Sequence, residues 1–65
     1  MKIDSTKLRE LREQRSLSVR GLAKEASVST ETVYSIEHGK RQPNLKTLGK
    51  IALALGVNPE DLLTR

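Results

Sequence analysis

Five polar side chains fall within a short segment near the middle of the chain, and their spacing places them on one side of a helix. They are Thr30, Glu31, Thr32, Ser35 and His38. A period of three to four residues turns Val33 and Ile36 inward and leaves the polar set facing solvent. Hydroxyl, carboxylate and imidazole groups on an exposed helix face can exchange hydrogen bonds with a polar partner.

A second short helix is expected immediately before this one, and the segment 18–38 predicts two helices joined by a tight turn. Small or apolar residues occur at a spacing that lets two helices cross closely; they are Leu22, Ala23, Ala26, Val28, Val33 and Ile36. A polar helix facing outward from such a unit, on a basic chain, indicates DNA as the partner.

Composition limits the other possibilities. The 65 residues form at most one domain, 1–65, with a modest core, and 12 Lys and Arg against 8 Asp and Glu give a net charge of +4. This balance favours polyanionic partners. Because the chain has no cysteine, neither disulfides nor thiolate-bound zinc can hold the fold together.

Several functional classes lack support in the sequence. No apolar run is long enough for a membrane span, and the charged first 20 residues do not resemble a secretory signal, so a cytoplasmic, nucleoid-associated protein is expected. There is no nucleophile–base pair, glycine-rich phosphate loop or cluster of metal ligands, so we expect neither an enzyme nor a cofactor. His38 is the single histidine and has no evident partner for a metal.

Apolar periodicity throughout the chain predicts an all-α fold with about five helices. The expected helices cover about 5–15, 19–26, 30–38, 45–55 and a short last segment from 59 to 63. Ser5 or Thr6, Ser18, Ser29, Asn44 and Asn58 are the predicted N-caps, and Gly39 and Gly56 the terminators. Leu17 should anchor the first turn, and the fourth helix should bury Leu45, Leu48, Ile51, Ala52 and Leu55.

Nearly the whole chain resembles the helix-turn-helix family of phage repressors and Cro, also called the xenobiotic-response-element family. The resemblance rests on LxxLR at 8–12, Leu22-Ala23, TVYSIEHGKRQP at 32–43, LxTLxKIAxALGV at 45–57 and PEDLL at 59–63. It implies a bundle of five helices whose third helix enters the DNA major groove while the second spans the backbone above it.

The resemblance also implies which residues read bases, namely Thr30, Glu31 and Ser35. Threonine can contact either type of base, whereas the Glu31 carboxylate can only accept, which suits the amino group of cytosine. A carboxylate near phosphates is unfavourable, so Glu31 has an alternative role in stabilising the start of its helix. Both interpretations of Glu31 stay open at this point.

Contacts to the DNA backbone are expected from the helix starts and the basic loop. The residues concerned are Ser18, Val19 through its amide, Thr32, Tyr34, His38, Lys40, Arg41 and Gln42. Each expectation has an alternative. Lys40 and Arg41 could simply be hydrated side chains of a surface loop, without a role in binding. Tyr34 could pack against the second helix instead of reaching a phosphate.

Two further features follow from the family pattern. Arg12 and Glu37 match an arginine and a glutamate that pair largely out of water, which would fix the orientation of the third helix. Ser27 departs from the pattern, because relatives usually have glycine at this turn position, where φ is positive. Val19 departs as well, since relatives often have a polar residue there.

The expected function is sequence-specific binding of double-stranded DNA by a homodimeric repressor, on a palindromic operator with half-sites about 34 Å apart. The alternative is an antitoxin or protein-interaction adaptor on the same fold, with a toxin or polymerase as its partner. Apolar residues beyond the needs of so small a core form the candidate dimer surface: Leu53, Val57, Leu62 and Leu63.

Overall fold

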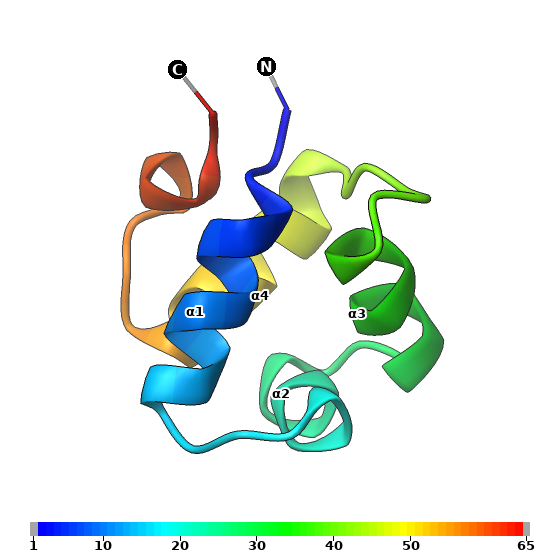
Figure 1. Ribbon diagram of the computed structural model, residues 1–65, viewed down its shortest axis with the longest axis vertical. Coiled ribbons are helices and arrows are strands. Elements are labelled where there is room, and N and C mark those ends of the chain that lie inside the picture. The colour runs from blue at the N-terminus through cyan, green and yellow to red at the C-terminus, as the bar shows by residue number, and fades with distance from the viewer. Residues whose placement is uncertain (1, 65) are drawn as a thin grey trace.

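The computed structural model describes residues 2–64, which form four α-helices and one turn of 3-10 helix (Figure 1). These are α1 (Ser5–Gln14), α2 (Val19–Ala26), α3 (Thr30–Glu37), α4 (Leu45–Leu55) and the 3-10 helix η1 (Pro59–Leu62). The all-α prediction is confirmed, but the fifth α-helix is wrong. After η1 the backbone becomes extended at Leu63, with φ −101° and ψ 147°, so no α-helix follows.

Polar caps explain where the α-helices begin. Three of the predicted N-caps accept a hydrogen bond from the first helical turn: Ser18, Ser29 and Asn44. The prediction for α1 is wrong, because Asp4 caps it by accepting from the Lys7 N–H at 3.1 Å, in place of Ser5 or Thr6. The Ser5 hydroxyl instead donates to the carbonyl of Ile36, at 2.8 Å, and so ties α1 to α3.

The helix ends include one interaction that the sequence does not reveal. Both predicted terminators, Gly39 and Gly56, adopt the left-handed conformation, with φ of 71° and 72°. At the C-terminus of α4, the guanidinium of Arg15 donates to the Leu55 carbonyl at 2.9 Å. Arg15 follows α1 directly, so this bond fastens the end of α1 to the end of α4.

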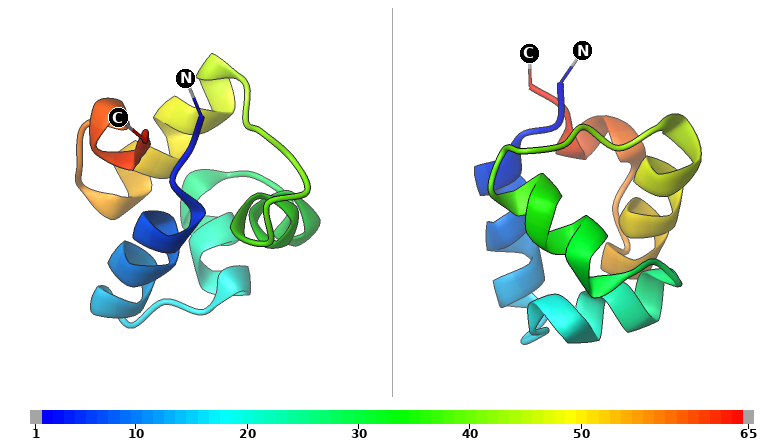
Figure 2. Two further views of the ribbon diagram at one scale, coloured as in Figure 1. Left: turned by 45° about the horizontal axis from the view of Figure 1, so that its top comes forward. Right: turned by 90° about the vertical axis from the view of Figure 1, so that its right-hand side faces the viewer.

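The core lies where the inner faces of all the helices meet. Its fully buried larger side chains are Leu8, Leu22, Val33, Ile36, Ile51 and Leu62, and Leu17 and Val28 pack at its edge. Leu45 does not belong to it and is 82% exposed, against expectation. The α4 helix begins at the end of the molecule opposite α2, so α2 does not cover its first turn (Figures 1 and 2).

The two ends of the chain pair with each other, although the sequence shows no alternation typical of strands. Ile3 and Leu63 form an isolated antiparallel bridge, in which the Asp4 N–H donates to the Leu62 carbonyl at 2.7 Å. Ile3 is 4% exposed and joins the core. Within residues 2–64, no helix is both long enough and apolar enough to cross a bilayer.

Candidate nucleic-acid interface

The turn between α2 and α3 sets the angle at which the polar helix leaves the core. Ser27 has φ 57° and ψ 43°. This is the left-handed conformation expected at this turn position, where relatives usually have glycine. Ser29 then begins α3: its hydroxyl oxygen accepts from the Thr32 N–H at 3.1 Å and lies 2.7 Å from the Thr32 hydroxyl. Thr32 is thus partly engaged within its own helix.

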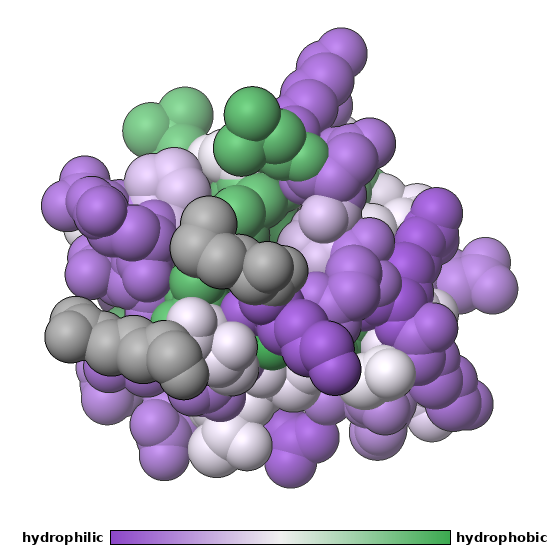
Figure 3. Space-filling view, turned by 90° about the horizontal axis from the view of Figure 1, so that it is seen from above, coloured by the Kyte–Doolittle hydropathy of each residue, from purple (hydrophilic) through white to green (hydrophobic). Residues whose placement is uncertain are grey.

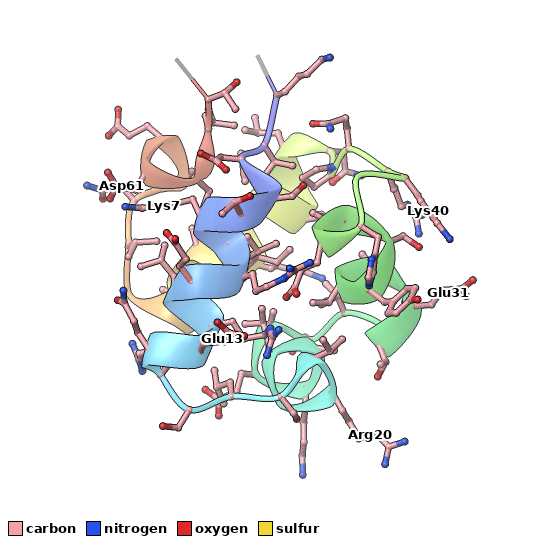
Figure 4. All side chains as sticks on the ribbon, in the orientation of Figure 1. Lys7, Glu13, Arg20, Glu31, Lys40 and Asp61 are labelled. Carbon is pink, nitrogen blue, oxygen red and sulfur yellow. The ribbon has the colours of Figure 1, made fainter. Side chains whose placement is uncertain are left out.

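The α3 helix lies across one side of the molecule, where no other helix covers it (Figure 2, right). Its inner side chains Val33 and Ile36 are fully buried, which fixes the rotation of the helix about its axis. Thr30 and Glu31 are consequently exposed in the first turn, and Ser35, one turn later, is half-buried. The Glu31 side chain points away from the body of the molecule (Figure 4).

The basic loop that follows α3 stays close to the helix. Its N–H groups return to α3, with Lys40 donating to the Ser35 carbonyl at 2.9 Å. Both Lys40 and Arg41 are exposed, and the Arg41 guanidinium lies 3.4 Å from the Thr32 hydroxyl. Lys40 and Glu31 point to the same side of the molecule (Figure 4). Two cationic groups therefore adjoin the exposed polar face.

Tyr34 and His38 pair with each other on the outer side of α3. Their ring centroids are 4.0 Å apart, with the planes inclined at 42°. The Lys40 ammonium lies 5.9 Å from the centre of the Tyr34 ring, within range of a cation–π contact. Tyr34 remains 48% exposed, so its hydroxyl is accessible from solvent.

A buried ion pair connects α3 to α1, as the family pattern predicted. The Arg12 guanidinium donates to both carboxylate oxygens of Glu37, at 2.6 and 3.0 Å, and also to the Leu17 carbonyl at 2.8 Å. Glu37 is only 5% exposed. The hydrogen bond to Glu37 raises the pKa of Arg12, and burial opposes that rise.

The start of α2 presents a second set of groups. The Ser18 hydroxyl accepts from the Gly21 N–H at 2.9 Å, while Val19 is half-buried against the core. Arg20, in the first turn of α2, was not among the predicted residues. It is exposed and points outward (Figure 4). Its position beside the predicted Ser18 and Val19 is a signal that could have identified it.

The Gln42 side chain has a partner that sequence reasoning missed. Its oxygen Oε1 accepts a hydrogen bond from the backbone N–H of Ile3, at 2.9 Å. The two residues are 39 positions apart, and no local pattern announces such a contact. Within residues 2–64, no cluster of three His, Cys, Asp or Glu side chains is placed to hold a metal ion.

The four residues of the expected dimer surface do not form one patch. Leu62 is fully buried in the core, because η1 turns it toward α1 and α4, so that expectation is wrong. Val57 and Leu63 line a hollow of about 470 Å³ together with Leu11. Leu53 is 83% exposed on α4, and it lines a separate hollow. Apolar surface gathers on the side of the molecule where α4 lies (Figure 3).

Comparison with known proteins decides the family. A family model described as "Helix-turn-helix" matches residues 8–62. The chain belongs to this helix-turn-helix family. The resemblance to phage repressor and Cro-type regulators is thus confirmed, and the fold is that of DNA-binding transcriptional regulators.

Three similar proteins illustrate this helix-turn-helix relationship. The HTH-type transcriptional regulator DdrOP3 of Deinococcus deserti is 37% identical over 88% of the chain, which spans only 44% of that relative. The restriction-modification controller protein C.AhdI of Aeromonas hydrophila is 34% identical, with a TM-score of 0.87 over 91% of this chain and 89% of the other. SinR, a master regulator for biofilm formation solved in complex with DNA, is 26% identical, with a TM-score of 0.87 over 92% and 100% of the two chains.

Proposed function

We propose that this helix-turn-helix chain binds double-stranded DNA in a sequence-specific way, with α3 in the major groove. The observation that carries the proposal is the placement of Thr30 and Glu31, which are exposed on the first turn of α3. Arg41 supplies positive charge beside that turn, 3.4 Å from the Thr32 hydroxyl, and Lys40 supplies it further along α3, near Tyr34. SinR, a structural neighbour, was solved in complex with DNA, which supports DNA as the partner.

The roles of the interface residues follow from their chemistry. Thr30, Glu31 and the half-buried Ser35 are proposed to read base edges, with Glu31 accepting from the cytosine amino group. The DNA backbone is proposed to meet groups that donate hydrogen bonds or carry positive charge. These are Ser18, the amide of Val19, Thr32, Tyr34, His38, Lys40, Arg41 and Gln42, to which the structure leads us to add Arg20.

Repression by occupying an operator in the cytoplasm is the activity we propose for this domain. A homodimer would place two copies of α3 about 34 Å apart on a palindromic site. The hollow formed by Leu11, Val57 and Leu63 is the surface we propose for self-association. A toxin or polymerase subunit is the alternative occupant of this hollow, and then DNA binding would accompany protein interaction.

The decisive experiment selects bound sequences from random double-stranded DNA, with the wild type and Glu31→Gln in parallel. We expect a defined consensus for the wild type, and a changed preference at one base pair for Glu31→Gln, because an amide donates as well as accepts. Glu10→Gln is the matched control, since it removes the same charge from an exposed position on α1 that lies outside both α3 and the hollow.

The possible results separate the claims. An unchanged consensus for Glu31→Gln would leave Glu31 with the helix-stabilising role alone. If the wild type binds no duplex even at low salt, where electrostatic attraction is strongest, the proposed function is wrong.

A further inference from the structure

Gln42, at the end of the basic loop, is attached to the opposite end of the chain. Its Oε1 accepts from the Ile3 N–H at 2.9 Å. Ile3 is itself held in place, because its side chain is buried and both neighbouring residues are hydrogen-bonded to the C-terminal segment. The Asp4 N–H donates to the Leu62 carbonyl, and the Lys2 carbonyl accepts from the Thr64 N–H. The loop is therefore held by a part of the backbone that the core and the bridge immobilise.

The same N-terminal segment also holds the other end of the loop. The Ser5 hydroxyl donates to the Ile36 carbonyl in the last turn of α3, at 2.8 Å. The loop containing Lys40 and Arg41 thus lies between two hydrogen bonds to residues 3–5. The start of this loop runs beside the N-terminal segment (Figure 2, right).

Gln42 could serve DNA binding in two ways, and these use different atoms. A phosphate oxygen only accepts hydrogen bonds, so it would engage the Nε2 amide group. The Ile3 N–H only donates, and it engages Oε1. Anchoring and direct phosphate contact can consequently be separated by changing one partner at a time.

We propose that Gln42 is a positioning residue, whose carboxamide oxygen holds Lys40 and Arg41 against the DNA backbone through its bond to Ile3. The inference rests on the proposed DNA binding. Long cationic side chains on a mobile loop lose entropy when they are ordered on phosphates, and a loop that is fixed beforehand loses less. Gln42 thus acts through its neighbours in the loop.

The test removes the Ile3 N–H without touching any side chain. A chain of 65 residues can be assembled by chemical synthesis, and the α-hydroxy analogue of isoleucine at position 3 replaces the amide N–H by an ester oxygen. The matched control is the same change at Thr64, whose N–H donates to the Lys2 carbonyl at 2.8 Å. The control weakens the same pairing of the chain ends but leaves the Gln42 bond intact.

We expect the ester at Ile3 and Gln42→Met each to lower affinity for a duplex about 3-fold to 10-fold. A chain with both changes should bind no more weakly than a chain with one, because each change removes the same hydrogen bond. The slope of log affinity against log salt should fall by about one unit, because a cation of the loop loses its phosphate. The ester at Thr64 should leave both quantities unchanged. Circular dichroism is the check that each variant chain remains folded.

A second readout needs no DNA. The ester at Ile3 should increase the nanosecond mobility of the Lys40 and Arg41 amides in ¹⁵N relaxation, and the ester at Thr64 should not. If the wild type does not bind duplex DNA, the proposed function is wrong, but the relaxation measurement still tests whether the hydrogen bond between Gln42 and Ile3 holds the loop. Unchanged mobility would overturn the positioning role, as would an affinity that falls for Gln42→Met but not for the ester at Ile3.

Discussion

At the scale of single residues, Glu37 is the position where we expect a substitution to lower stability most. It is the one buried polar or charged side chain among residues 2–64, and Arg12 neutralises it through two hydrogen bonds. The Arg12 side chain is only 13% exposed, so water screens the pair poorly. Since the Glu37 bond raises the pKa of Arg12, the stability that this shift contributes is fully present at neutral pH and is lost as the pH rises through the pKa of Arg12 in the folded protein.

Glu37→Ala should lower the free energy of unfolding by about 3–5 kcal/mol, because it leaves the Arg12 charge largely buried without its partner. DNA affinity should fall as well, since the pair fixes α3 against α1. Urea denaturation followed by circular dichroism measures the first effect, and titration of duplex measures the second. Where Glu37→Ala is too unstable to purify, Glu37→Gln retains the shape of the side chain and should show a smaller loss.

Arg9→Ala supplies the control for this pair. The Arg9 guanidinium lies 3.6 Å from the same Glu37 carboxylate, but its side chain is 48% exposed. An exposed ion pair contributes about 1 kcal/mol or less. A loss for Glu37→Ala no greater than that for Arg9→Ala would contradict the importance of the buried pair.

Sequence patterns predicted some residue contacts and could not predict others. The Arg12–Glu37 pair was expected because both residues lie in recognisable family motifs. The bonds from Gln42 to Ile3 and from Arg15 to the Leu55 carbonyl join residues 39 and 40 positions apart. Either side chain could equally be solvated on the surface, so only the folded backbone determines its partner.

At the scale of elements, the turn between α2 and α3 retains a residue that is poorly suited to its conformation. Ser27 has a φ of 57°, where the Cβ atom of an L-residue approaches the following carbonyl oxygen. This strain costs about 1 kcal/mol. The serine hydroxyl has no hydrogen bond within the described structure that would offset the cost.

Ser27→Gly should therefore raise the free energy of unfolding by about 0.5–1 kcal/mol, after allowance for the greater freedom of glycine in the unfolded chain. Thermal and urea unfolding measure the change. Ser27→Ala is the matched control, since it removes the hydroxyl but keeps the Cβ atom, and it should leave stability nearly unchanged. Stabilisation by alanine equal to that by glycine would show that the hydroxyl, and not the backbone conformation, is the source of strain.

The elements themselves were largely predictable, because most are bounded by strong local signals. The predicted bounds of α2 and α4 agree with the structure, and α3 ends one residue earlier than expected. The errors at Leu63 and Leu45 fall where tertiary contacts override local preference. Pairing of the chain ends draws Leu63 into an extended conformation, and α4 extends past the core at Leu45.

At the scale of the whole molecule, the two candidate binding surfaces lie on different sides. The α3 helix is on one side, while α1 and η1, which frame the hollow, are on the other (Figure 1). Leu11, Val57 and Leu63 contribute apolar surface to this hollow, and its charged lining residues are Asp4, Lys7, Glu60 and Asp61. A partner bound there would leave α3 free to contact DNA.

If self-association uses this hollow, Leu63→Glu should shift the protein from dimer to monomer in sedimentation velocity experiments. Loss of an apolar side chain from each copy, together with the cost of burying a carboxylate in the interface, should weaken the dimer at least about 10-fold. Leu53→Glu is the matched control, because Leu53 is 83% exposed and lines a different hollow. Loss of the dimer in Leu53→Glu but not in Leu63→Glu would show that the interface is the outer face of α4. A wild type that is monomeric at all concentrations tested would contradict self-association and favour a different protein as the occupant of the hollow.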